Sequence, residues 1–265
     1  MIESAPIWVI TDIDGTLMDH SYDLTPAKET IEWLTNLNIP VIPCTSKTAA
    51  EVRVIRQDLG LNDPFIVENG AAIHGGGISN DWEIILGKSY IRLHEILNHL
   101  SKDVDYKLVP LNDLNDKEAY ELTGLNGNDL DLMRDRHWSM PFLNPPNFIE
   151  DKLLKCCSKY DVNIFRGNRM SHLLSINSDK GKAVKRLIEF SKNYNVKTIG
   201  LGDSPNDLPL LQTTNFKIVI PGLAGPNLKL INQLSNVEYI LAKDPHGYGW
   251  KSEITKLIQN LLDEN

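Results

Sequence analysis

Near its start the chain reads Trp8-Val9-Ile10-Thr11-Asp12-Ile13-Asp14-Gly15-Thr16-Leu17. Apolar residues lead straight into two aspartates, so the pattern predicts a buried strand with two carboxylates at its end. Alternation along a strand sends Asp12 and Asp14 to the same side, and Gly15 allows a sharp turn after them. One carboxylate can then attack phosphorus and form an aspartyl-phosphate while its neighbour serves as proton donor. A solvated turn would show the same Asp-x-Asp pattern, so the rest of the sequence has to decide between the two.

The bulk composition argues against several classes of protein. Of the 265 residues, 42% are apolar, which is ordinary for a globular enzyme. A formal net charge of -8 argues against nucleic-acid binding, which needs clustered Lys and Arg. An anionic substrate must therefore meet a local basic pocket or a bound divalent cation.

Cysteine usage and hydropathy indicate a cytoplasmic protein. Cys44, Cys156 and Cys157 suit neither a disulfide framework nor a Cys-x-x-Cys metal site. No apolar run reaches the roughly 18 residues needed to span a bilayer, and residues 1–4 lack the basic start of a signal peptide. We therefore expect a reducing compartment and no membrane partner.

Strands and helices alternate at both ends of the chain, which predicts an α/β fold. In the first part we expect a helix at 26–37 with Thr25 as N-cap, a strand at 39–44, a helix ending at Leu59 and closed by Gly60, and a strand and turn at 64–70. The last part repeats the pattern with a helix at 180–195, strands at 197–201 and 216–220, and a helix at 250–262. Such alternation implies a parallel sheet covered on both faces, with ligands at the carboxyl ends of its strands.

The middle of the chain breaks this alternation and predicts an inserted domain. It carries two helical stripes, at 93–100 and 149–157, and a hairpin of residues 162–166 and 170–176 around Gly167 and Asn168. We expect residues 1–84 and 176–265 to form a catalytic core and residues 85–175 a small α+β cap over the sheet. Residues 126–129 and 144–147 are expected to be loops inside the cap.

Polar residues stand at predicted strand ends or at a helix start, and an open α/β sheet collects such positions into one crevice. They are Asp12 and Asp14, Thr45 with Ser46 and Lys47, Lys180, and Asp203 with Asn206 and Asp207. Phosphoryl transfer needs a nucleophile, an acid, hydrogen-bond donors, a cation and carboxylates that hold magnesium, and each has a candidate here. Lys180 could instead be a surface residue of a lysine-rich helix, and Thr45 a plain helix N-cap.

In order and spacing, Asp12-Ile13-Asp14-Gly15-Thr16, Thr45, Lys180 and Gly202-Asp203-Ser204-Pro205-Asn206-Asp207 resemble the four motifs of the haloacid dehalogenase superfamily of phosphatases. The resemblance implies that Asp12 accepts the phosphoryl group and that Asp14 protonates the leaving oxygen and later activates water. It also implies that Thr45 and Lys180 grip the phosphoryl oxygens. The Mg²⁺ site would comprise Asp12, the Asp14 carbonyl and Asp203, with Asp207, Asn206 or Ser204 orienting its waters or the lysine.

A narrower resemblance covers nearly the whole chain. Segments 43–48, 68–71, 167–172 and 200–207 look like those of the mannosyl-3-phosphoglycerate phosphatase family. This resemblance implies a Rossmann-like core with an α/β cap inserted between the second and third motifs. It further implies hydrolysis of mannosyl- or glucosyl-3-phosphoglycerate to the glycosylglycerate, a compatible solute. Met140 stands where the family commonly has a glutamate, which leaves the choice of sugar open.

A phosphorylated sugar-glycerate substrate needs fixed cations and many hydrogen-bond partners. The candidates are Ser46 and Lys47, the turn Glu68-Asn69-Gly70, the cap residues Arg169 and His172, and Asn206. Arg169 suits a carboxylate or phosphate because its guanidinium can donate two parallel hydrogen bonds. Strand alternation puts His172 on the opposite face, so a buried structural imidazole is as plausible there as a ligand contact. Lys47 could also be a surface lysine, and residues 68–70 a plain turn.

Other functions fit the sequence less well. A phospho-receiver signalling domain also uses an acceptor aspartate, a threonine and a lysine, but it needs neither Asp14 nor an inserted cap. A catalytically dead scaffold would not keep Asp12, Asp14, Lys180 and Asp203 together. Among phosphatases, sucrose-phosphate or another sugar phosphate is the main alternative substrate.

Overall fold

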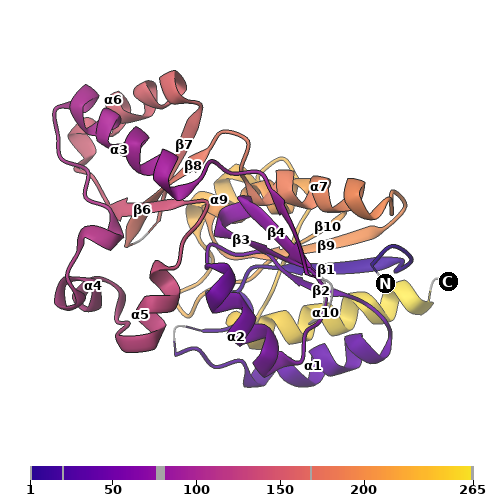
Figure 1. Ribbon diagram of the computed structural model, residues 1–265. Helices are drawn as coiled ribbons and strands as arrows, with labels where there is room; N and C mark the ends of the chain where they lie inside the picture. The colour runs from indigo at the N-terminus through magenta and orange to yellow at the C-terminus, as the bar shows by residue number, and fades with distance from the viewer. Residues whose placement is uncertain (1, 20, 76–80, 168, 264–265) are drawn as a thin grey trace.

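The computed structural model describes residues 2–19, 21–75, 81–167 and 169–263. A large sheet flanked by helices forms one part of the molecule, and a smaller group of helices and strands projects from it (Figure 1). The large sheet has five parallel strands in the order β11-β10-β9-β1-β2. These strands are β1 (Ile7–Thr11), β2 (Val41–Pro43), β9 (Lys197–Gly202), β10 (Phe216–Val219) and β11 (Ile240–Leu241). The predicted parallel α/β core is thereby confirmed.

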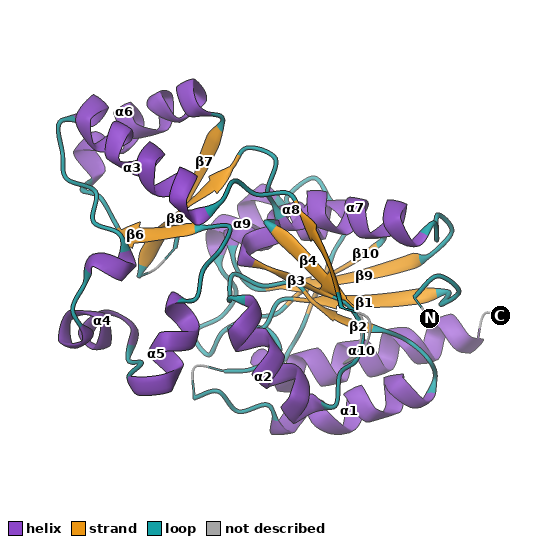
Figure 2. Ribbon diagram, in the orientation of Figure 1, coloured by secondary structure: helices purple, strands orange, loops and turns teal. Residues whose placement is uncertain are grey.

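Helices cover both faces of this sheet. On one face lie α1 (Thr25–Asn36) and α10 (His246–Asp263), and on the other lies α7 (Lys180–Ser191), as Figure 2 shows. Successive side chains of β1 pack on opposite faces, with Val9 in the cluster that includes α1 and α10 and with Trp8 and Ile10 in the cluster that includes α7. Because both faces are buried, the strand appears in the sequence as an unbroken apolar run.

The third expected strand departs from the parallel pattern. β3 (Phe65–Val67) meets the main sheet at the parallel bridge between Cys44 and Ile66, and it pairs antiparallel with β4 (Ala72–Gly75). β5 (Trp82–Ile85) completes this second sheet. The chain reverses after β3 because three successive residues have positive φ, namely Glu68, Asn69 and Gly70. The turn was predicted from the sequence, whereas the hairpin strands β4 and β5 were not.

A separate hydrophobic core lies in the middle of the chain, and its buried residues run from Leu93 to Leu173. An antiparallel sheet in the order β6-β8-β7 packs there against helices (Figure 1). The elements of this cap are α3 (Tyr90–Val104), α4 (Asp116–Thr123), α5 (Gly127–Arg134), β6 (Met140–Leu143), α6 (Asn147–Cys157), β7 (Val162–Arg166) and β8 (Met170–Ser175). The separate antiparallel cap is confirmed, whereas its boundaries at residues 85 and 175 stay predictions.

Some local predictions are wrong in detail. Residues 126–129 are not a loop, because Asn126 is the N-cap of α5 and the next three residues form its first turn. Leu130 is the buried residue of α5, so the helix lacks the apolar stripe that would have indicated it. Thr25 is the first residue of α1 rather than its N-cap, and Asn147 already belongs to α6. Asn168, expected in the cap hairpin, lies outside the described residues.

The remaining core helices are short or peripheral to the sheet, and they are α2 (Ala49–Leu59), α8 (Leu208–Thr213) and α9 (Leu228–Gln233). Gly60 closes α2 in the left-handed conformation, as predicted. None of the helices described is long and apolar enough to cross a membrane.

Candidate active site

Three of the predicted motifs meet at the carboxyl edge of the main sheet. Asp12 follows β1 and Asp203 follows β9, its parallel neighbour. On the other side of β1, the Cys44 N–H donates to the Thr11 carbonyl oxygen at 2.7 Å, which brings Thr45 beside the same strand end. The parallel register therefore gathers residues that are far apart in the chain.

Lys180 is a buried cation between two carboxylates. Its Nζ donates to Asp12 Oδ1 at 2.6 Å and to Asp207 Oδ1 at 2.5 Å, and its side chain is wholly buried. Although burial lowers it, Asp12 and Asp207 together raise the pKa of Lys180 above its ordinary value. A fixed positive charge therefore lies beside Asp12, and the surface-lysine alternative is wrong.

Gly70 acts on the site by positioning Lys180. A Cβ at this position would lie 2.2 Å from the Asp179 carbonyl oxygen, and its φ of +87° suits glycine. The turn after β3 can therefore pack directly against the start of α7. Asp179 caps that helix, since its carboxylate accepts a hydrogen bond from the Lys182 N–H at 2.7 Å.

Three aspartate carboxylates lie close together at this edge of the sheet. Oxygen atoms of Asp12, Asp203 and Asp207 all lie within 4.8 Å of one another. Burial raises the pKa of Asp12 to about 7 against the opposing effect of Lys180, and burial followed by Asp207 and Asp12 raises the pKa of Asp203 well above its usual range. Clustered carboxylates with one lysine lack positive charge, and a hard divalent cation with oxygen ligands fits this set. The Asp14 side chain, by contrast, pairs with Lys47.

Asp207 holds the lysine and the loop that carries Asp203. Its Oδ1 accepts from Lys180, while its Oδ2 accepts from the N–H groups of Asp203 and Ser204, both at 3.0 Å. Both carboxylate oxygens are thus engaged by protein donors. The resemblance left open whether Asp207 orients the waters of Mg²⁺ or the lysine, and these contacts support the second role.

Asp14 occupies the outer side of the cluster. Its side chain is 41% exposed, compared with 6% for that of Asp12. Gly15, which follows Asp14, makes the turn with a φ of +82°, and a Cβ there would lie 2.7 Å from the Asp203 carboxylate. One carboxylate therefore points inward while the other lies at the opening, as the turn after the strand predicted.

Lys47 brings a second cation to the site. Its Nζ lies 3.1 Å from Asp14 Oδ1 and 3.5 Å from Glu51 Oε1. Burial lowers the pKa of Lys47, but Asp14 and Glu51 outweigh it and raise the pKa above its usual range. At 8% exposure Lys47 is not a surface lysine.

The contribution of Glu51 to this ion pair was not predicted, although Thr48-x-x-Glu51 is the sequence pattern of a capping box.

Thr45 is not a helix N-cap, because that position of α2 belongs to Thr48. The Thr45 hydroxyl is wholly buried and accepts from the Lys47 N–H at 3.2 Å. Two other predicted contacts, Asn69 and Asn206, are joined to each other by an amide hydrogen bond of 3.1 Å. That bond ties the turn after β3 to the Asp203 loop.

Glu68 holds the cap against the core. Its Oε1 accepts from the His137 N–H at 2.9 Å, and its Oε2 accepts from the Trp138 N–H at 3.1 Å and the Ser139 hydroxyl at 2.5 Å. The residue is 1% exposed. Since the carboxylate is engaged by the cap, we do not propose Glu68 as a sugar contact.

Two further bonds cross this seam between cap and core. The half-buried Ser46 accepts at its carbonyl from Arg136 Nη1 at 3.0 Å, and the Thr48 hydroxyl donates to the Leu132 carbonyl at 2.8 Å. The segment that follows Thr45 is therefore fastened to the cap on both sides of Lys47.

Glu68→Gln should destabilise the protein by about 1–3 kcal/mol, because it replaces one acceptor oxygen by an NH₂ group that faces backbone donors. Urea unfolding followed by circular dichroism measures the loss. The matched control is Glu83→Gln, whose exposed carboxylate accepts from the Trp138 indole at 3.1 Å and should change stability by about 0.5 kcal/mol or less. Equal effects of the two substitutions would contradict the special role of Glu68.

The two predicted cap residues lie apart from the carboxylates. Exposed Arg169 donates from Nη1 to the Thr123 carbonyl at 2.7 Å, a bond within the cap. His172 lies on β8, and its Nδ1 is buried without a hydrogen-bond partner among the described residues. Burial, and then Arg136, lowers the pKa of His172 to about 3, so the imidazole is neutral.

Hydrogen bonds from the last helix to the segment around Asp12 were not predicted. His246 Nδ1 donates to the Gly15 carbonyl at 3.0 Å, and the Trp250 indole donates to the Thr11 hydroxyl at 3.0 Å. Both come from α10, and no local pattern around position 12 could indicate them. Thr16 also contributes, since its hydroxyl donates to Asp203 Oδ1 at 3.3 Å.

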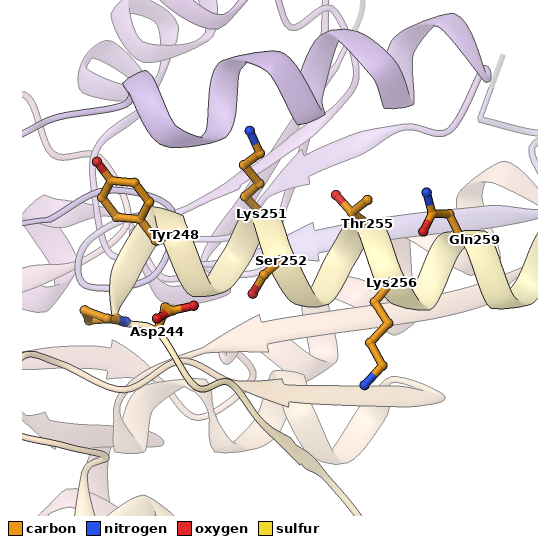
Figure 3. Close-up of a pocket in the computed structure, with 8 residues that line it drawn as sticks. Asp244, Tyr248, Lys251, Ser252, Thr255, Lys256 and Gln259 are labelled. Carbon is orange, nitrogen blue, oxygen red and sulfur yellow. The ribbon is translucent and has the colours of Figure 1, made fainter.

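An open hollow of about 670 Å³ lies along α10 and is drawn in Figure 3. Its lining includes Tyr248, Lys251 and Lys256 but none of the predicted site residues. Lys251 is already paired with Glu29 at 2.6 Å. We therefore do not count this hollow as part of the candidate site.

Asp203→Asn should stabilise the metal-free protein at neutral pH. A raised carboxyl pKa means that the folded state keeps a proton that the unfolded chain releases, so stability falls as the pH rises from about 4 towards 7 and beyond. The amide removes this loss and should raise Tm at pH 7.5 by about 2–4 °C for each kcal/mol regained. Differential scanning calorimetry in EDTA and in Mg²⁺ measures both this gain and the loss of any stabilisation by Mg²⁺. A lower metal-free Tm, with Mg²⁺ stabilisation intact, would argue against the carboxylate cluster as the metal site.

Comparison with known proteins identifies the family. The model of the haloacid dehalogenase-like hydrolases matches residues 9–138 and 147–231. A glucosyl-3-phosphoglycerate/mannosyl-3-phosphoglycerate phosphatase from Persephonella marina is 32% identical over 273 residues, which cover 96% of this chain and 97% of that protein.

Solved structures share the fold at low sequence identity. BT1666 of Bacteroides thetaiotaomicron, a phosphatase of the same superfamily, has a TM-score of 0.71 at 15% identity and covers 95% of this chain and 94% of its own. The sucrose-phosphatase of Synechocystis has a TM-score of 0.66 at 16% identity, with 95% and 98% covered. The chain thus belongs to the haloacid dehalogenase-like hydrolases, as its four motifs predicted, in the family that includes the Persephonella marina phosphatase.

Proposed function

We propose that the protein is a Mg²⁺-dependent phosphatase that hydrolyses mannosyl- or glucosyl-3-phosphoglycerate to the glycosylglycerate and phosphate. The observation that carries the proposal is the buried Asp12 carboxylate, held 2.6 Å from the Lys180 ammonium and next to the half-exposed Asp14. An inner nucleophile and an outer proton donor suit a phosphate ester whose organic part stays at the opening. The similarity to the Persephonella marina phosphatase supports the choice of substrate.

Hydrolysis would proceed in two steps. In the first, an Asp12 oxygen attacks phosphorus, the bond from phosphorus to the leaving oxygen breaks, and Asp14 gives its proton to that oxygen. In the second, Asp14 takes a proton from a water molecule whose oxygen attacks phosphorus, which frees the Asp12 carboxylate and inorganic phosphate. Lys180 offsets the charge on the phosphoryl oxygens throughout, and Thr45 and Ser46 are the candidate hydrogen-bond donors to them.

Asp12 and Asp203, together with the Asp14 carbonyl, would hold Mg²⁺, and Asp207 would keep Lys180 and the Asp203 loop in place. When bound, the ion would offset the negative charges of the nucleophile and the phosphate. Lys47, Asn69 and Asn206 line the same edge and are the remaining candidates for polar contacts with substrate.

Arg169 is our candidate in the cap for the glycerate carboxylate, because it is exposed and, among the described residues, only its Nη1 makes a hydrogen bond. His172 is the weaker candidate, since its imidazole is neutral and its Nδ1 buried.

The partner that this proposal implies is a small phosphorylated molecule and not a nucleic acid. The unpaired buried cysteines 44, 156 and 157 are in keeping with a cytoplasmic setting.

A phosphate-release screen tests the proposal. The purified protein is given Mg²⁺ with glucosyl-3-phosphoglycerate, mannosyl-3-phosphoglycerate, sucrose-6-phosphate and simple hexose phosphates, and each assay is repeated in EDTA. We expect fast, Mg²⁺-dependent release from at least one of the two glycerates. Hydrolysis of sucrose-6-phosphate without hydrolysis of either glycerate would refute this substrate assignment, and full activity in EDTA would refute the metal requirement.

A further inference from the structure

Tyr22 adopts a backbone conformation that is unusual for an aromatic residue. Its φ is +64°, and no other tyrosine in the described part of the chain has a positive φ. Bulky side chains rarely enter this region, and such a residue stays there only when its surroundings hold it. Here the hold comes from Asp19, whose Oδ1 accepts from the Ser21 N–H at 2.9 Å, the Ser21 hydroxyl at 2.7 Å and the Asp23 N–H at 3.2 Å.

The strained loop places the ring at the open side of the candidate active site. Lys47 Nζ lies 5.2 Å from the centre of the Tyr22 ring, within the range of a cation–π contact. The same Nζ is 3.1 Å from Asp14 Oδ1. The ring is therefore one side chain away from the carboxylate that we assign to protonate the leaving oxygen.

Exposure separates the inner and outer parts of this site. The Asp12 side chain is 6% exposed and that of Asp14 41%, so the phosphate end of a substrate belongs inside and its organic part outside. Tyr22 remains 48% exposed even though Lys47 lies over its ring. An aromatic side chain offers a large, stiff contact surface with a polar tip, which suits a sugar ring that has both C–H groups and hydroxyls.

We propose that Tyr22 contacts the sugar ring of the substrate and is a specificity-determining residue. The inference rests on the proposed function, because it takes Asp14 as the acid on the leaving-group side. The contact would be made by the organic part alone, so the phosphoryl chemistry at Asp12 does not depend on it.

The test compares two substrates that differ only by the sugar, glucosyl-3-phosphoglycerate and 3-phosphoglycerate. If this pair is not hydrolysed, it compares the best sugar phosphate of the screen with the smallest phosphate ester that the enzyme hydrolyses. Tyr22→Ala should raise KM for the sugar ester about 10-fold, the equivalent of 1.4 kcal/mol, and leave kcat/KM for the small ester unchanged. Tyr22→Phe should resemble the unsubstituted protein. The control is Tyr194→Ala, which removes another exposed tyrosine, 71% exposed. Its neighbour Asn193 donates hydrogen bonds to the carbonyls of Ile2 and Ala5, which precede β1, so Tyr194 lies at the end of the sheet opposite the candidate site.

Each outcome decides the matter. Equal losses on both esters would mean that the ring acts only through Lys47 and Asp14, and an unchanged KM for the sugar ester would mean that it makes no sugar contact. Either result overturns the role of Tyr22 while the phosphatase function stands. If the unsubstituted protein hydrolyses no sugar phosphate at all, the proposed function fails and the Tyr22 contact fails with it. An unchanged Tm of Tyr22→Ala shows that the fold is intact.

Discussion

Asp12→Asn should lower kcat by at least about 10⁴-fold, because an amide cannot form the acyl phosphate on which both steps depend. The substitution keeps the shape of the side chain, and Lys180 retains its bond to Asp207. We therefore expect the circular dichroism spectrum to be unchanged. Phosphate release at saturating substrate measures the loss. The matched control is Asp105→Asn, an exposed aspartate in the left-handed position after α3, where asparagine fits equally well.

The intermediate itself can be caught. Borohydride reduces an acyl phosphate to the alcohol, so quenching the enzyme during turnover should convert Asp12 to homoserine, and peptide mass spectrometry locates the change. Labelling at Asp14 in place of Asp12 would reverse the assigned roles. Near-normal turnover by Asp12→Asn would remove the aspartyl-phosphate mechanism altogether.

The core of the site could be predicted because its residues stand at strand ends. Asp12, Thr45 and Asp203 each follow a strand of one parallel sheet, and parallel register alone brings such positions together. Lys180 was placed in the same crevice because it begins a core helix, but its pairing with Asp12 was not predicted. Positions at strand ends therefore sufficed to bring these candidate residues together.

What could not be predicted depends on contacts between distant segments. Glu68 was expected to contact substrate or to belong to a plain turn after a strand, but its carboxylate is buried by cap residues that come about 70 positions later. His246 supports Gly15 from the last helix. Tyr22 lies in a short polar loop where a single aromatic gives no periodic signal. Each of these roles arises from how the elements pack rather than from any pattern within them.

Lys180→Met should cost about 3–5 kcal/mol of stability at pH 7.5 in EDTA, in addition to most of the activity. Methionine fills a similar volume, but it leaves the carboxylates of Asp12 and Asp207 buried without their cation. Lys182→Met is the matched control on the same helix. Its side chain is 48% exposed and its ammonium pairs with Asp179 at 2.9 Å, so its loss should cost about 1 kcal/mol or less.

The pH dependence separates charge from packing at Lys180. Burial raises the pKa of Asp12 to about 7 although Lys180 lowers it, so without Lys180 this carboxyl takes up a proton even more readily as the pH falls from 7.5 to 5.5, and it then no longer needs a cation. The penalty of Lys180→Met should therefore shrink over that interval, whereas a packing defect would cost the same at both values. Urea unfolding of both variants at the two pH values measures this. A penalty that is independent of pH, or one no larger than that of Lys182→Met, would show that Lys180 acts as a space-filling residue and not as the cation that stabilises the nucleophile.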